Sequence, residues 1–278
     1  MTRTTLPLLV ALALLAAGCD SNESTAPPET TAPTETEPQQ REETTFAIYL
    51  LRDGLVAPVR RVGDATPAVA RAALEQLVAG PTASERLEGL ETAIPDGTTV
   101  LGVSLEDGTA TVDLSGTFDE PGDRPSLRGR VAQVIATLTQ FPTVQRIAFR
   151  LDGAPVERIG NGDLPVEPPL GRRAIEDQTG QILIESPLPG DTVTSPIRLR
   201  GTANVFEATV SLEVRDATGA VVHEAFTTAT SGTGTRGTFD TLLTLPGLDG
   251  PMTIVAFESS AEDGRPLHAT DVQVTLAP

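Results

Sequence analysis

TTVLGVSLEDGTATVDL, residues 98–114, decides the fold of the first half of this 278-residue chain. Its two ends, Thr98–Val103 and Thr109–Leu114, are rich in β-branched residues and are separated by a turn that contains Asp107-Gly108. An Asp-Gly pair supplies the positive φ angles that a tight hairpin turn needs. The stretch therefore predicts two antiparallel strands.

Strand and helix patterns continue on both sides of this hairpin. Before it, Phe46–Leu50 reads as a buried strand, and a turn at Asp53-Gly54 leads to a second strand that runs to Val62. A helix should then start with Thr66 as N-cap and Pro67 in the first helical position. Its inner face carries Val69, Ala70, Ala73, Leu74, Leu77 and Val78, and Gly80-Pro81 ends it.

A second helix and a last strand follow the hairpin. The helix is expected from Ser126 to Pro142, with an inner face of Val131, Val134, Ile135 and Leu138. The strand is Arg146–Leu151, and Asp152-Gly153 turns the chain after it. The order β-β-α-β-β-α-β predicts an α+β domain over residues 45–160, in which two helices pack against one mixed sheet.

The last hundred residues have a different pattern. Residues 161–179 are rich in Gly, Pro and charge and are expected to be an interdomain linker. Residues 180–278 contain short runs of Val, Thr, Ile and Leu between turns, with no helical period. Seven strands are expected, at 182–185, 197–201, 210–215, 220–227, 239–245, 253–258 and 271–276. This spacing predicts an all-β immunoglobulin-like sandwich without a disulfide.

The N-terminus has the layout of an export signal. Residues 1–18 combine Arg3, an apolar stretch from Leu6 to Ala17 and small residues before Cys19. The apolar stretch is too short to cross a bilayer, which takes about 20 residues. Residues 19–44 are mostly Ser, Thr, Pro, Glu and Ala, so we expect a disordered acidic tether rather than a loop of the first domain.

Cys19 is the only cysteine of the chain. Residues 14–19, Leu-Leu-Ala-Ala-Gly-Cys, resemble the bacterial lipobox, although Ala16 stands where that motif favours Leu, Val or Ile. The resemblance implies that Cys19 carries a lipid such as palmitate and becomes the first residue of the mature protein. Ordinary cleavage after Gly18 is the alternative. A multiply acylated cysteine is a sufficient membrane anchor, since each buried methylene contributes about 0.8 kcal/mol.

The first domain resembles the GerMN family of sporulation and spore germination. The matching stretches are Leu74 to Pro81, Ala93 to Thr98, Gly108 to Phe118 and Gln133 to Gly153. The second domain resembles the immunoglobulin-like module of bacterial spore germination proteins, chiefly through Gly201 to Ala208, with Ser186-Pro187 and Gly190. The pair of modules implies a scaffold or assembly role outside the cytoplasm, because GerMN is similar to ring-building domains of secretion machines.

Composition excludes several functions. The formal net charge is −18, which disfavours binding to a phosphate backbone, so no nucleic-acid partner is expected. Aromatic residues make up 3% of the chain, so flat sugar-binding platforms are scarce. No nucleophile elbow, zinc-binding helix or phosphate loop is present in the sequence, and we expect no catalytic residue, no metal and no cofactor.

A few polar positions are candidates for binding. The turn Asn204, Val205, Phe206 and Glu207 is a possible interaction loop, but the favoured interpretation is structural: Phe206 plugs the sandwich while Gly201 and Asn204 form a turn. Asp113 and Ser115 either bind a ligand or cap backbone amides. The remaining candidates are expected to lie on the surface or in loops: His223, His268, the glycine-rich loop 232–237, and the acidic pairs Glu42-Glu43 and Glu262-Asp263, for which a weak calcium site is the alternative.

These observations predict a lipid-anchored extracytoplasmic protein that binds rather than catalyses. It would act as a scaffold in the cell envelope, attached to the membrane through Cys19, with an envelope protein or a second copy of itself as partner. The alternative is an accessory protein that binds or remodels peptidoglycan.

Overall fold

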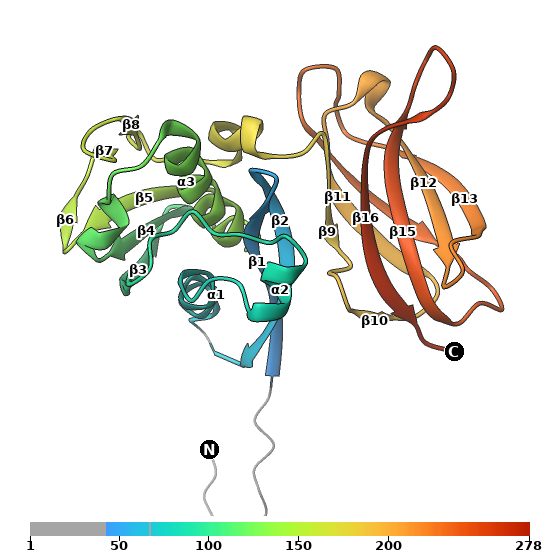
Figure 1. Cartoon of the computed structure of the whole chain (residues 1–278), viewed down its shortest axis with the longest axis horizontal. Helices are drawn as coiled ribbons and strands as arrows, with labels where there is room; N and C mark the ends of the chain where they lie inside the picture. Colours follow the sequence, from blue (N-terminus) through green and yellow to red (C-terminus); the bar gives the residue numbers. More distant parts are fainter. Residues whose placement is uncertain (1–42, 67) are drawn as a thin grey trace, which may run out of the picture. The chain divides into compact units, whose positions relative to one another are not determined.

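A computed structural model describes residues 43–66 and 68–278 (Figure 1). Cys19, the predicted signal and most of the predicted tether lie outside these residues. The first strand begins at Glu43, so the tether as predicted ends two residues too late. No helix among the described residues has the length and apolar content to cross a bilayer.

The N-terminal part contains the expected strands and helices, with small shifts at their ends. Its strands are β1 (Glu43–Arg52), β2 (Leu55–Asp64), β3 (Val100–Glu106), β4 (Thr109–Leu114), β5 (Arg146–Leu151), β6 (Ala154–Pro155), β7 (Arg158–Ile159) and β8 (Leu164–Pro165). Its helices are α1 (Val69–Val78), α2 (Ala83–Leu87), α3 (Arg124–Leu138), and the 3-10 turns η1 (Gly116–Asp119) and η2 (Arg172–Gln178). The α+β class is confirmed.

Three Asp-Gly pairs turn the chain where the sequence predicted. In each pair both residues have positive φ: 52° and 77° at Asp53-Gly54, 48° and 75° at Asp107-Gly108, and 49° and 81° at Asp152-Gly153. These angles match the right-handed twist of the flanking antiparallel strands. The hairpins β1–β2, β3–β4 and β5–β6 are therefore fixed by local turn chemistry.

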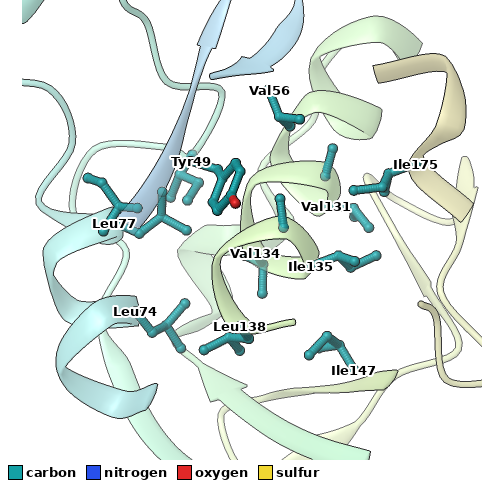
Figure 2. Close-up of a cluster of buried hydrophobic side chains, with 14 of the residues drawn as sticks. Tyr49, Val56, Leu74, Leu77, Val131, Val134, Ile135, Leu138, Ile147 and Ile175 are labelled. Atoms are coloured by element: carbon teal, nitrogen blue, oxygen red, sulfur yellow. The ribbon is translucent and has the colours of Figure 1, made fainter. Parts of the chain in front are cut away.

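The prediction of a single sheet is wrong. Strands β1 and β2 form a sheet of their own, and the second sheet has the order β3-β4-β5-β6, with β4 and β5 parallel. Helix α3 is buried on every side rather than on one face, and its neighbours in the core come from β1, α1, β5 and η2 (Figure 2). An inner face of four apolar residues was therefore only part of its buried surface.

Polar side chains of α3 and of the turn that follows it take the place of a neighbouring strand for β1. Gln133 donates to the Tyr49 carbonyl at 3.2 Å, and the Thr137 hydroxyl accepts from the Tyr49 N–H at 3.0 Å. Gln140 accepts from the Ala47 N–H at 2.9 Å and donates to the Ala47 carbonyl at 2.6 Å. Buried backbone groups need partners, and these side chains, two from α3 and one from the turn after it, supply partners for β1.

The start of α1 differs from the prediction. The helix begins at Val69, and its N-cap is Ala68, which makes no side-chain cap. The Thr66 hydroxyl accepts from the Ala68 N–H at 3.1 Å, which is a local turn one step before the helix. Thr66 is therefore not the N-cap. It lies two residues before the N-cap Ala68, and its hydroxyl bonds the N–H of Ala68 rather than an N–H of the helix.

Helix α2 begins with a capping box that sequence patterns left unnoticed. The Thr82 hydroxyl accepts from the Glu85 N–H, and the Glu85 carboxylate accepts from the Thr82 N–H at 2.7 Å. Arg61 of β2 donates to both Glu85 oxygens, at 2.5 and 2.8 Å. Burial alone would raise the pKa of Glu85, but the Arg61 and Thr82 hydrogen bonds outweigh it and hold this pKa below its usual value.

We expect Glu85→Gln to lower the free energy of unfolding by about 1–2 kcal/mol at pH 7, because a capping acceptor and a bidentate ion pair are lost. The pKa is lower in the folded state, so the contribution is present above the carboxyl's unfolded pKa of about 4.3 and disappears as pH falls through the folded value. Urea unfolding at pH 7 and pH 3 checks this. Glu75→Gln, which removes an exposed pair with Arg71, should cost less than about 0.5 kcal/mol. An equal difference between wild type and Glu85→Gln at both pH values would contradict the assignment.

Residues 161–179, expected to be a linker, carry β8 and η2. Val166 and Ile175 are buried in the N-terminal core, and so are Leu183 and Leu188 from the start of the next domain. Arg172 of η2 pairs with Glu185 at 2.8 Å, and the Tyr49 hydroxyl donates to the same carboxylate at 3.1 Å. Burial, and then the negative charge of Glu185, raise the pKa of Tyr49, so its hydroxyl stays protonated. The segment is thus an ordered connection.

The C-terminal part is the predicted sandwich, and the fold class is confirmed. Its strands are β9 (Ile182–Ser186), β10 (Thr192–Val193), β11 (Ile197–Ala203), β12 (Thr209–Asp216), β13 (Val221–Thr228), β14 (Gly237–Leu243), β15 (Gly250–Ser259) and β16 (Pro266–Leu276). The short 3-10 turn η3 (Phe206–Ala208) precedes β12. One sheet has the order β10-β16-β15-β12-β13 and the other β14-β11-β9, with one apolar core of residues from both sheets.

Candidate functional site

The predicted interaction loop lies between β11 and β12, at one end of the sandwich (Figure 1). Val205 is buried in the sandwich core, whereas the Phe206 side chain is 55% exposed. The favoured expectation, that Phe206 plugs the sandwich, is therefore wrong. Val205 is extended, so successive side chains point to opposite sides, and the smaller Val205 takes the inward position. Gly201 lies within β11 and not in the turn.

Asn204 is committed to internal contacts. Its side-chain amide donates to Glu176 at 3.0 Å, and its oxygen accepts from the Gly234 N–H at 2.8 Å. Arg236 pairs with the same Glu176 carboxylate at 2.9 and 3.1 Å. The glycine-rich loop 232–237 is thus held at Gly234 and at Arg236. Asn204 positions the loop and is not free to bind a ligand.

Two consecutive residues after Phe206 have backbone angles that L-residues seldom adopt. Glu207 has a φ of 53° and Ala208 a φ of 57°. Each costs on the order of 1–2 kcal/mol in the absence of a glycine. The turn is held by Glu258, which accepts from the Phe206 N–H at 3.1 Å, and by Thr233, which accepts from the Glu207 N–H at 3.2 Å. A strained turn maintained in this way keeps an aromatic side chain outside the core, and such strain is typical of functional positions.

A second exposed phenylalanine, which the sequence did not single out, lies at the same end of the sandwich. Phe226 of β13 is 72% exposed and lies directly opposite Ser211 of β12. Thr209, the residue after η3, lies opposite Thr228, so the Phe206 turn and the end of β13 are neighbours. Phe226 stands at an alternate position of a strand-like run, and that alternation was the only signal. We call Phe206 and Phe226 the aromatic end.

Two glutamates lie near Phe226, two positions further along the paired strands β12 and β13. Glu213 and Glu224 lie directly opposite each other on β12 and β13, where like charges repel. Arg215 neutralises Glu213 through a contact of 2.6 Å. Among the described residues, Glu224 has no such basic partner. The surface therefore combines apolar area with an uncompensated negative charge.

The other candidate residues do not come together into a site. Asp113 accepts from the Gly153 N–H at 3.0 Å and Ser115 from the Thr99 N–H at 3.0 Å, so both cap backbone amides. His223 on β13 and His268 on β16 are separated by β12 and β15. Asp263 pairs with Arg265 at 3.5 Å. Across residues 43–66 and 68–278, no three His, Cys, Asp or Glu side chains are grouped as metal ligands.

Both parts of the chain match known domain families. Residues 47–157 match the family described as sporulation and spore germination, and residues 181–265 match the immunoglobulin-like domain of bacterial spore germination. Each of the two parts is thus similar to a spore-germination domain. The resemblance seen in the sequence, to GerMN and to the immunoglobulin-like module, is confirmed.

Individual relatives cover only part of the chain. Spore germination protein GerM of Bacillus subtilis is 31% identical over 130 residues, which are 45% of this chain and 35% of that protein. This chain thus matches about a third of the length of that relative. The first GerMN domain of the same protein has a solved structure with 26% identity and a TM-score of 0.41, covering 47% of this chain and 98% of the domain. Its tandem GerMN domains match with 19% identity and a TM-score of 0.43, covering 73% of this chain and 62% of theirs.

Proposed function

We propose that this chain is a lipid-anchored, extracytoplasmic binding protein of the cell envelope, which engages a protein partner and catalyses no reaction. The aromatic end is the observation that carries the proposal. Most phenylalanines of the chain are buried, whereas Phe206 and Phe226 are exposed at one end of the sandwich. Exposed apolar area beside a strained turn is typical of an interaction site, and aromatic residues are enriched in interfaces.

The anchor is the second element of the proposal, and it rests on the export signal and on the solitary Cys19. We expect a clickable fatty acid to label the wild-type protein in growing cells and the Cys19→Ala variant to carry no label. The variant should also leave the membrane fraction, because its acyl anchor is missing. A wild-type protein that is processed after Gly18 and carries no label would contradict the anchor and favour ordinary secretion.

The partner is tested by crosslinking in cells followed by purification. We expect the double variant Phe206→Ser/Phe226→Ser to recover at least fivefold less of the partner that wild type recovers, since truncating an interfacial aromatic anchor commonly costs more than 1 kcal/mol. Leu242→Ser is the matched control, because Leu242 is 61% exposed on β14 of the other sheet.

Three outcomes of the same experiment would count against a protein partner at the aromatic end. The double variant could retain the full yield, the Leu242 control could lose as much, or wild type could yield no reproducible partner. Sedimentation with purified peptidoglycan addresses the other class of function. Saturable co-sedimentation of the wild type would favour a wall-binding accessory protein, as the sequence analysis kept open.

A further inference from the structure

Strand β13 is a free edge of the larger sheet of the sandwich. The sheet order ends at β13, which pairs with β12 on one side. Its eight residues include no buried one, and Val221, Val222 and Phe226 are among the exposed large apolar residues. An edge strand leaves a row of backbone N–H and C=O groups unpaired, and natural proteins usually cover or blunt a long apolar edge.

The outward face of β13 has a defined chemical pattern. Leu212 of β12 is buried and lies opposite Ala225, so Ala225 faces the core while Glu224 and Phe226 face outward. An added antiparallel strand would place its own outward residues beside these two. A cation beside Glu224 would supply the basic partner that Glu224 lacks among the described residues, and an apolar or aromatic side chain would cover Phe226.

We propose that β13 receives an extended, basic segment of a partner protein, which adds as a further strand and places Lys or Arg beside Glu224 and an apolar residue beside Phe226. This inference rests on the proposed function, because it names the mode and the chemistry of that partner. Backbone pairing along a free edge supplies affinity, and alternate side chains supply specificity.

Charge selects this occupant over others. A second copy that paired its own β13 would bring an identical Glu224 to the edge, and two chains of net charge −18 would repel each other. The chain's own residues 20–44 contain seven acids and one arginine, so their net negative charge would add to the repulsion at Glu224. A basic segment would pair with the free backbone groups of β13 and would also neutralise Glu224.

The test uses a short end-blocked peptide in which lysine and phenylalanine alternate on one face and threonine fills the other. It is titrated into the isotopically labelled full chain and followed by the backbone amide resonances. We expect saturable shifts confined to β12 and β13 and slower amide exchange in β13. Phe226→Ala should weaken binding at least fivefold, and Glu224→Gln should weaken it two- to fivefold, the range of an exposed ion pair.

Matched controls distinguish strand addition from non-specific binding of the peptide. The same peptide with N-methylated backbone amides cannot pair with an edge, and the same peptide with glutamate in place of lysine reverses the charge; both should bind at least tenfold more weakly. Leu242→Ala, on the edge of the other sheet, should leave the affinity unchanged.

Several results would overturn the inference. The N-methylated peptide could bind as tightly as the unmodified one, the shifts could centre on β14, or the lysine peptide could show no saturable binding. A concentration-dependent dimer that Phe226→Ala abolishes would also overturn it, because it would assign the edge to a second copy. The peptide could be found not to bind while crosslinking still recovers a partner that depends on Phe206 and Phe226. That result would contradict strand addition and leave the proposed function supported. If crosslinking recovers no partner, the proposed function falls.

Discussion

Gln133→Leu should destabilise the N-terminal domain by about 3 kcal/mol or more. The Gln133 amide is fully buried in α3, where it donates to the Tyr49 carbonyl and accepts from the Ala93 N–H at 2.8 Å. Leucine preserves the volume and the helix propensity but removes these two hydrogen bonds, together with the one that Gln133 accepts from the Thr92 hydroxyl at 3.3 Å. Each backbone group left buried without a partner costs about 1–3 kcal/mol, which exceeds what the added apolar side chain contributes.

The chain offers a convenient measurement of this effect. Tyr49 is the only tyrosine and there is no tryptophan, so tyrosine fluorescence during urea unfolding reports on the N-terminal domain. Gln140→Leu is the matched control. Gln140 makes the equivalent pair of bonds to Ala47 but is only half-buried, so water can replace it and the cost should be about 1 kcal/mol. A loss at Gln133 no larger than the roughly 1 kcal/mol expected at Gln140 would show that the buried hydrogen bonds of Gln133 contribute little to stability.

These glutamines illustrate what the sequence could and could not predict. The three Asp-Gly turns were predicted correctly because their conformation depends on two adjacent residues. The hydrogen-bond partner of the β1 edge was not predicted. Gln133 lies 84 positions from Tyr49, and no local sequence pattern indicates that contact. An apolar pattern on one face of α3 likewise could not reveal that its polar residues are buried as well.

In the candidate site, too, some features could be predicted from the sequence and others could not. The turn at residues 204–207 stood out because it belongs to the stretch that carries the family resemblance, and it lies between two strands as expected. Which of Val205 and Phe206 points inward depends on the strained angles at Glu207 and Ala208 and on the packing of the far sheet. Phe226 was hidden within an ordinary alternating strand, since only the sheet order shows that β13 is an edge.

Gly201→Ala should cost the sandwich about 3 kcal/mol or more. A methyl group at this position of β11 would lie 2.2 Å from the Leu183 carbonyl oxygen and 2.5 Å from the Phe239 ring. Phe239 is buried and Leu183 belongs to β9, so neither can move without opening the three-stranded sheet. Overpacking of a well-packed core usually costs 1–3 kcal/mol, and a backbone clash lies at the upper end of that range or beyond it.

Circular dichroism of the β-rich sandwich during thermal and urea unfolding measures the effect of Gly201→Ala, while Tyr49 fluorescence follows the N-terminal domain in the same sample. Gly219→Ala is the control. Gly219 has a φ of 84° but open space around its Cα, so alanine there carries backbone strain alone, about 1–2 kcal/mol. A loss at Gly201 no larger than at Gly219 would mean that β9 and Phe239 yield to the added methyl group. Glycine at position 201 would then not be required by the close approach of β9, β11 and Phe239.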